Sequence, residues 1–389
     1  MAGFARLLEP PRLRTRGRGV DEERRATWLE LFFDLVFVAA VGQLANALAA
    51  EPTTARFFEF LALFAPVWWA WMGFTFYANR FDTDDLLYRL LSLLAMFCVA
   101  VLATTIPSVF RGATEGFPLA YVAVRLVLVT LYARASRHVP EARALASSFL
   151  GAFSVAVLIW LSSLLVDAPW AYVLWGVALS IELVAPIPAW RRLREAPVDR
   201  RHLPERFGLL TLIVLGESVL AVVLGVSKVS WDAGSAAAAG SGFVVAAALW
   251  WIYFDFLDEG ALTARGIFGG LTYTYMNYFV VVGLASLGAG VKLAVLDAGG
   301  DHRYDDTSWV LSAGLALTMV GLGVIQLVAG TVVVDADVVL RLVTAALALA
   351  LVPFGLSPLT VVTVFAGVLV AQVVFELARH ETHTHPAEV

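Results

Sequence analysis

The chain has 389 residues, of which 60% are hydrophobic and 15% are charged, and its formal net charge at pH 7 is -5. A soluble domain carries about 25% charged residues, so this composition excludes an ordinary soluble protein. The hydrophobic residues come in blocks of about 20, which is enough for a helix to cross a bilayer, and the segments of about 10 alternating residues that are typical of outer-membrane strands do not occur. We therefore predict an all-α polytopic membrane protein.

The N-terminal residues 1–27 contain seven arginines and lack the apolar core of a signal peptide. They predict a basic cytoplasmic arm that contacts anionic lipid, and nothing indicates nucleic-acid binding. The single cysteine, Cys98, excludes an internal disulfide and suggests no metal site.

Twelve apolar blocks separated by charged residues or by Pro and Gly predict twelve transmembrane helices. The eleventh block contains Pro353, and only the segment PFGLSP separates it from the twelfth, so these two are either separate helices or a broken hairpin. The predicted spans are 29–50, 57–79, 87–107, 117–137, 145–166, 170–190, 206–227, 240–256, 272–296, 308–330, 338–355 and 357–379.

Positive charge is unevenly distributed between the predicted loops. With the N-terminus in the cytoplasm, 21 of the 27 Lys and Arg residues lie in the arm or on the cytoplasmic side. Because cytoplasmic loops are enriched in Lys and Arg, we predict that both termini are cytoplasmic.

Similar residues recur in the two parts of the chain. Glu30 and Glu205 stand at the start of spans one and seven, and spans six and twelve carry Glu182 and Glu376 near their ends. An even number of spans in each part gives both the same orientation, so we predict two parallel six-helix repeats. The predicted parts are an arm (1–27), a first half (28–190), a cytoplasmic linker (191–204), a second half (205–379) and a disordered tail (380–389).

Two motifs, ELFFDLVFV from Glu30 and PERFGLLTLIVLGES from Pro204, resemble the two signatures of the bacterial low temperature requirement protein A family. The resemblance covers the chain from Trp28 to about Arg379. It implies a multi-pass protein of the bacterial plasma membrane, and it implies no particular reaction or substrate.

Glu217 interrupts an apolar span about 18 Å from its inner end, close to the membrane midplane. A carboxylate at this depth is costly, so it indicates either a proton or solute carrier or a protonated acid that bonds helices together. Ser218 beside it suits either reading, and Gln43 lies at the matching position of the first span.

Arg125 lies eight residues inside the fourth span, where a guanidinium needs a carboxylate partner or must extend towards the outer surface. Glu217 and Glu182 are its possible partners, and Glu217 is preferred because its depth matches better. Together with Gln43 and Ser218, these residues form the predicted substrate- or ion-binding set.

Glu30 and Asp34 lie on one face of the first span at its cytoplasmic end. Glu30 has the position of an acid that stabilises a helix start. Asp34 lies deeper and is predicted to face Arg206 or another arginine of the cytoplasmic loops, as a cytoplasmic gate or as a structural clasp. The predicted gate residues are Glu30, Asp34, Glu205, Arg206, Asp82 and Asp258, the last two of which are alternatively helix caps.

The tryptophans of the second and eighth spans, Trp68, Trp69, Trp71, Trp250 and Trp251, are either packing or interfacial residues or the lining of a cavity. Gly283, Ser286 and Gly290 form a small-residue seam that predicts close helix packing.

No nucleotide-binding or nucleophile motif occurs, so we expect neither an enzyme nor a cofactor. The favoured hypothesis is a secondary transporter that moves a small solute, either with or without coupling to protons. The alternatives are a non-catalytic membrane sensor or assembly factor, and an integral-membrane enzyme that acts on a lipid or another hydrophobic substrate.

Overall fold

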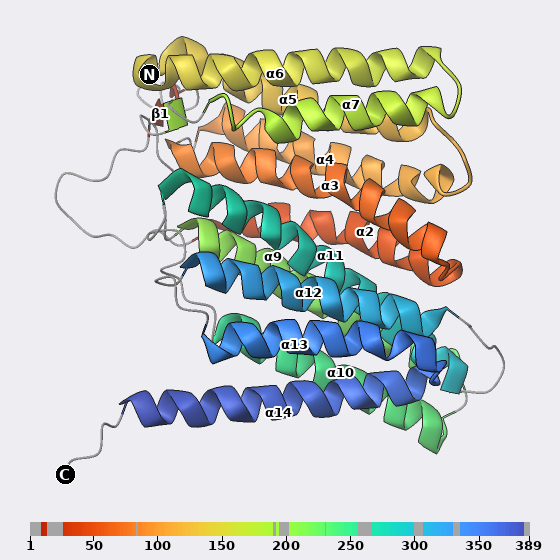
Figure 1. Ribbon diagram of the computed structural model, residues 1–389. Helices are drawn as coiled ribbons and strands as arrows, with labels where there is room; N and C mark the ends of the chain where they lie inside the picture. The colour runs from red at the N-terminus through yellow and green to blue at the C-terminus, as the bar shows by residue number, and fades with distance from the viewer. Residues whose placement is uncertain are drawn as a thin grey trace. The chain divides into compact units, whose positions relative to one another are not determined.

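The structure is a computed structural model that describes residues 9–13, 26–82, 85–189, 192–193, 202–229, 231–255, 266–298, 306–329 and 335–384. This part of the chain is almost entirely helical, as predicted (Figure 1). Its α-helices are α2 (Trp28–Ala50), α3 (Thr54–Arg80), α4 (Leu86–Val109), α5 (Gly116–His138), α6 (Arg143–Ser162), α7 (Trp170–Val184), α9 (His202–Val226), α10 (Ala233–Phe254), α11 (Gly266–Ala298), α12 (Thr307–Ala329), α13 (Ala336–Ala350) and α14 (Pro358–Thr384).

Eleven helices of the described residues are long and apolar enough to cross a membrane, and α7 is the exception. The sixth helix is shorter than the predicted span over 170–190, because α7 has 15 residues and ends at Val184. Pro186 and Pro188 follow directly, and proline cannot continue a helix because it lacks a backbone N–H and restricts the residue before it.

The last two predicted spans are separate helices. A 3₁₀ turn, Val352–Phe354, follows α13, and Gly355 then takes a left-handed conformation with φ of 58°. The backbone of α14 stays helical to Thr384, beyond the predicted end at Arg379, so the first part of the predicted disordered tail is helical.

The described helices belong to two compact units, which we describe separately. The first unit comprises Met1–Leu44 and Leu63–Leu209, and the second comprises Ala45–Ala62 and Leu210–Val389. The division falls inside α2, α3 and α9, so each of these three helices contributes to both units.

In the first unit, α4, α5, α6 and α7 pack as successive neighbours joined by short connections. Asp85 caps α4 by accepting from the backbone N–H of Tyr88, and it also forms a bidentate ion pair with Arg134 at 2.7–2.9 Å. Two short strands, β1 (Arg12–Leu13) and β2 (Phe81–Asp82), pair antiparallel and attach the N-terminal arm to the end of α3.

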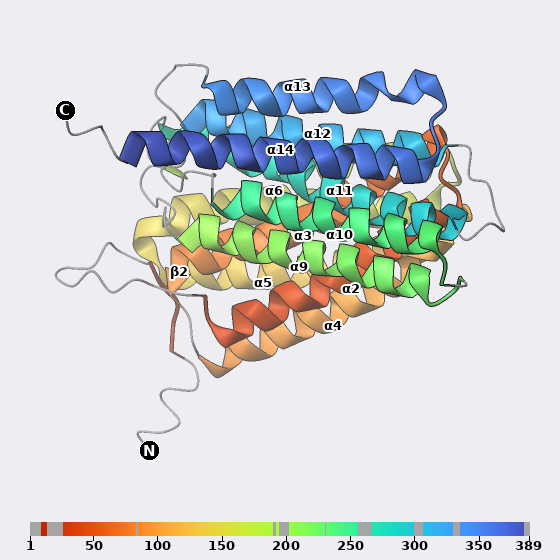
Figure 2. The same cartoon turned by 90° about the horizontal axis from the view of Figure 1, so that it is seen from below.

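In the second unit, α11 packs against α10, α12 and α14, and α12, α13 and α14 lie side by side (Figures 1 and 2). The predicted small-residue seam is confirmed. A Cβ on Gly283 would lie 2.6 Å from the carbonyl oxygen of Gly314, and Ser286 donates to the carbonyl oxygen of Val310. The backbones of α11 and α12 can approach this closely because the residues between them are small.

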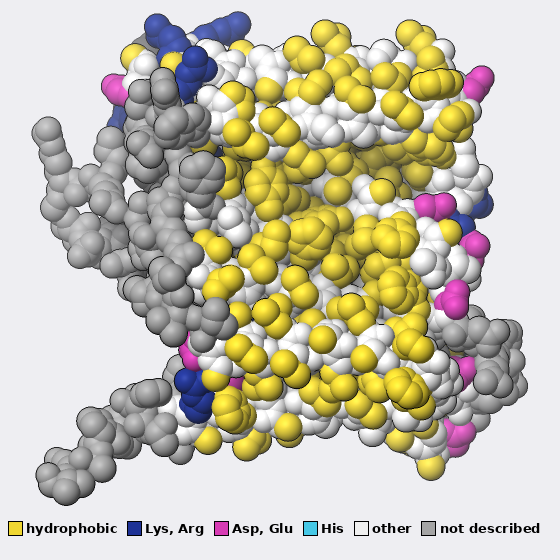
Figure 3. Space-filling view, in the orientation of Figure 1, with side chains coloured by type: hydrophobic (Ala, Val, Ile, Leu, Met, Phe, Trp, Pro, Cys, Tyr) yellow, Lys and Arg dark blue, Asp and Glu magenta, His cyan; other side chains and the backbone are white. Residues whose placement is uncertain are grey.

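Charged side chains gather near the helix ends, and hydrophobic side chains cover the length of the helices between them (Figure 3). At the start of α10, Asp232 accepts a hydrogen bond from the backbone N–H of Ser235, which lowers the pKa of this acid below its ordinary value. This distribution fits helices whose middle sections contact hydrocarbon and whose ends meet water.

We predict that Gly283→Ala destabilises the protein, because the new methyl group would overlap the backbone of α12. Overpacking typically costs about 1–3 kcal/mol, which a thermal unfolding curve in detergent would record as a lower midpoint. Gly367→Ala in α14 is the matched control, because a Cβ there has open space around it. Equal unfolding midpoints for the two variants would contradict close packing at Gly283.

Candidate functional site

The first part of the site is the start of α2. Thr27 and Glu30 cap this helix reciprocally: the Thr27 N–H donates to the Glu30 carboxylate at 2.8 Å, and the Glu30 N–H donates to the Thr27 hydroxyl at 3.3 Å. Asp34 stands one turn further along the same face, and both acids are buried. Glu30 therefore serves as a cap, whereas Asp34 has no such structural role in α2.

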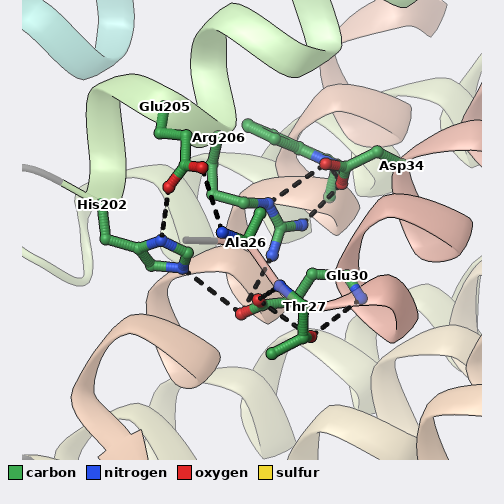
Figure 4. A network of polar contacts seen from close by, with 8 residues as sticks. Ala26, Thr27, Glu30, Asp34, His202, Glu205 and Arg206 are labelled. Atoms are coloured by element: carbon green, nitrogen blue, oxygen red, sulfur yellow. Dashed lines mark hydrogen bonds and ion pairs between the residues drawn. The ribbon is translucent and has the colours of Figure 1, made fainter. Parts of the chain in front are cut away.

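The partner of Asp34 is Arg206, one of the cytoplasmic-side arginines that the sequence left as candidates, and it comes from the first turns of α9. Its Nε and Nη2 atoms lie 3.1 and 2.5 Å from the two oxygens of Asp34 (Figure 4). Its Nη1 atom lies 3.4 Å from Glu30. One buried guanidinium thus binds both acids of α2, and the first motif is joined to the second in space.

His202 extends this cluster towards the aqueous end of α9. Its Nε2 atom lies 3.3 Å from a Glu30 oxygen and its Nδ1 atom lies 3.2 Å from a Glu205 oxygen (Figure 4). His202 is buried, whereas the Glu205 side chain is 36% exposed and accepts a hydrogen bond from the Ala26 N–H. Polar contacts therefore run without interruption from half-exposed Glu205 to fully buried Asp34.

Trp71 of α3 covers the buried end of the cluster. Its indole N–H donates to Asp34 at 2.7 Å, and its ring packs edge-on against Phe207. Trp68 and Trp69 are also buried, so these three tryptophans pack inside the first unit and are not interfacial, while Trp250 and Trp251 are partly exposed. The site is held by α2, α3 and α9 together.

A small cavity of about 10 Å³ adjoins Glu30 and Arg206, with Tyr88 and Ser92 of α4 on its wall. This volume is close to the lower limit for one water molecule. The cluster is therefore a dense ionic contact with room for at most a single water molecule beside it, and a larger solute does not fit there.

The deep arginine of the first unit has a different partner from the one preferred by depth. Arg125 pairs with Glu182 of α7, and the Tyr121 hydroxyl accepts from Arg125 at 2.6 and 2.9 Å while it donates to Glu182 at 2.8 Å. All three side chains are fully buried. The preference for Glu217 as the partner was therefore wrong, and Arg125 does not extend to the surface.

The preference for Glu217 failed because depth along a helix does not say which helices are neighbours. Arg125 and Glu182 meet because α5, α6 and α7 pack into one bundle, which residue counting cannot reveal. Gly73 of α3 makes room for the guanidinium, since a Cβ there would lie 2.9 Å from Arg125 Nη1.

The other three residues of the predicted binding set lie elsewhere. Glu217 is half-buried in α9, and the positive charge of Lys292 in α11 acts on it. Ser218 donates to the carbonyl oxygens of Val214 and Leu284, so it helps α9 to pack on α11. Glu217 and Ser218 belong to the second unit, and Gln43 is exposed. The predicted gate residues Asp82, by its side chain, and Asp258 lie outside the described residues.

Sequence reasoning missed His202 and the burial of Arg341. Arg341 was counted among the cations on the cytoplasmic side, yet it is fully buried in α13, where Nη2 lies 3.6 Å from Glu376 of α14. Gln372 donates to Glu376 at 2.8 Å. A signal was present in each case: His202 precedes Glu205 by about one helical turn, and Arg341 lies inside the predicted span 338–355, three residues from its start.

We predict that Arg125→Met and Glu182→Leu each destabilise the protein strongly, because each leaves one buried charge without its partner, at a cost of about 3–5 kcal/mol. The double variant should recover most of this loss. Thermal unfolding in detergent measures all three, with Arg111→Met at an exposed position as the control. A double variant that loses the sum of the two single effects would show that the side chains do not act as a pair.

The model of the family described as "Bacterial low temperature requirement A protein (LtrA)" matches residues 25–375. An uncharacterized protein of Rhizobium meliloti (strain 1021) is 30% identical over 242 residues, which are 60% of this chain. The match spans 59% of that relative's length. Because the family model covers nearly the whole chain, including the α2 acids and the α9 cluster, this multi-pass membrane protein belongs to the bacterial low temperature requirement A family.

Proposed function

We propose that this protein is a secondary transporter of the bacterial plasma membrane that couples the movement of a small solute to protons. We assign proton binding to the cluster of Glu30, Asp34, His202, Glu205 and Arg206. The observation that carries this proposal is the chain of polar contacts from half-exposed Glu205 through His202 to buried Asp34.

Hydrogen-bond chemistry supports the binding of a proton in this cluster. A neutral imidazole has one N–H donor and one acceptor, and an ionised carboxylate can only accept. His202 stands between two carboxyl groups, so both contacts are satisfied only if the imidazole is doubly protonated or if one of the acids is protonated. In this proposal, the cluster in its closed arrangement therefore binds one proton more than a neutral histidine between two carboxylates.

Loss of this proton would leave three carboxylates facing the single positive charge of Arg206. Repulsion between like charges in a buried site then favours separation of Glu205 and His202 from Glu30. Proton release therefore loosens the contact between α2 and α9, and proton uptake restores it. A contact of this kind can serve as a cytoplasmic gate.

The deeper polar residues have separate roles in this proposal. Glu217 is half-buried in the middle of α9, so it suits a solute- or ion-binding group. Arg125 and Glu182 neutralise each other in the core of the first unit, so they stabilise the helices around the pathway.

The proposal includes two parallel six-helix repeats. Glu182 and Glu376, at matching places near the ends of spans six and twelve, are both buried and both paired with a buried arginine. The arginines, however, come from the fourth and the eleventh span, so the likeness concerns the acids and does not extend to their partners.

We further propose that both termini are cytoplasmic, on the basis of the positive charge of the loops. Single cysteines at the two ends of α5 test this in a Cys98→Ala background. Glu115→Cys should react with an impermeant maleimide added to intact cells, and Arg137→Cys should react only after the membrane is opened. Both positions are exposed, so burial does not explain a difference. The reverse pattern would invert the topology.

Proton coupling predicts a loss of function for His202→Gln, because glutamine keeps one donor and one acceptor but cannot take up a proton. Proteoliposomes are loaded with a bacterial metabolite extract, and solute movement is measured by mass spectrometry with and without a pH gradient. The wild type should move at least one solute faster with the gradient, and His202→Gln should lose this acceleration.

His138→Gln is the matched control, because His138 is exposed and lies outside the cluster. It should retain the dependence on the gradient. If no solute moves faster than in empty vesicles, the transporter proposal is wrong and a sensor or assembly role is favoured. If solute moves equally with and without the gradient, proton coupling is wrong.

A further inference from the structure

The second unit contains an apolar groove between α9, α10 and α11, with a cavity of about 110 Å³. Its lining is almost wholly hydrocarbon, and Ser218, whose hydroxyl already bonds to the backbone, is the one residue with a polar side chain. Water in such a space would find too few hydrogen-bond partners, and apolar cavities of similar size take up hydrocarbon molecules instead.

Helix packing creates the groove. Both α9 and α10 (shown in green in Figure 2) approach α11 closely at glycines. A Cβ on Gly242 would lie 2.1 Å from a methyl carbon of Val291, and a Cβ on Gly288 would lie 2.5 Å from the Ser218 hydroxyl. These two tight contacts fix α9 and α10 on α11 and leave the hollow between them.

The rim of the groove is also apolar and open. Val223 is 57% exposed and Phe243 is 59% exposed, and both stand on its wall. All three helices are long and apolar enough to cross a membrane. The opening therefore lies within the hydrocarbon of the bilayer, where the available ligands are lipid chains.

One cation lies at the end of α9 beyond the groove. Lys228 is exposed and lies in a turn, two residues beyond Val226, the last residue of α9. This position puts an ammonium group at the level of lipid phosphates when the wall residues are at the level of the upper acyl carbons.

We propose that the groove binds one acyl chain of a phospholipid from the surrounding bilayer, with the lipid phosphate near Lys228. The bound chain fills a space that the protein's own side chains leave open, and so it stabilises the packing of α9 and α10 on α11. This inference is independent of the proton cluster, which belongs to the first unit.

Photo-crosslinking tests the proposal with the purified full-length protein in nanodiscs. The probe is a phosphatidylglycerol with a diazirine in the middle of one acyl chain, and labelled peptides are mapped by mass spectrometry. Labelling should concentrate on the groove walls of α9, α10 and α11, above the level found on the exposed lipid-facing residues Leu94 and Phe97 of α4. Uniform labelling of all exposed helix faces would overturn the proposal.

Ala246→Phe should reduce labelling of the groove at least fivefold, because Ala246 lines the groove and a phenyl group would fill it. Ala247→Phe is the matched control, since this neighbour is exposed outside the groove. Undiminished labelling in Ala246→Phe would exclude the site.

A second measurement uses the wild type alone, in case the Ala246→Phe variant does not fold. An excess of unlabelled long-chain phosphatidylglycerol should compete with the probe, and a short-chain lipid with the same headgroup should not. Equal competition by both would show that the headgroup and not the acyl chain is recognised.

Discussion

The buried ion pair between Asp34 and Arg206 is the contact on which the start of α2 and the start of α9 depend. A carboxylate and a guanidinium inside an apolar bundle are each costly alone, and each is tolerated because the other is within hydrogen-bond distance. Separation of the two helix ends would leave both charges without a partner in an interior of low dielectric constant. Trp71 and Glu30 complete the coordination, so the charges are fixed in position as well as neutralised.

The same constraint gives the cluster its proposed response to protons. Arg206 carries one permanent positive charge, whereas Glu30, Asp34 and Glu205 can carry three negative charges. His202 contacts two of these acids, and its ring is positively charged only when both of its nitrogens carry a proton. A proton at His202 therefore changes the charge balance of a contact that already holds two helices together. The two motifs that resemble the family signatures meet in this one cluster.

Each unit contains a further buried ion pair. Arg125 with Glu182 and Arg341 with Glu376 are buried pairs that join different helices, and in both cases neutral hydrogen-bonding groups, Tyr121 and Gln372, share the carboxylate. In hydrocarbon such pairs are strong constraints on which helices can be neighbours, because a wrong neighbour leaves a charge without a partner. The apolar groove of the second unit is the opposite case. There the side chains leave a space whose lining is almost wholly apolar, so a lipid chain is the proposed ligand.

The sequence by itself determined the class of protein, because the thickness of a bilayer sets the length of an apolar helix and therefore makes the spans readable. It also placed Glu30 and Asp34 on one face and predicted that Asp34 faces Arg206 or another cytoplasmic-side arginine, and the tertiary structure decided for Arg206. Tertiary structure alone decided that Arg125 pairs with Glu182, that His202 bridges Glu30 and Glu205, and that α9, α10 and α11 leave a groove. Sequence patterns give depth along a helix and the face of a helix, whereas partners depend on which helices pack together, and that is set by side-chain shape over the whole bundle.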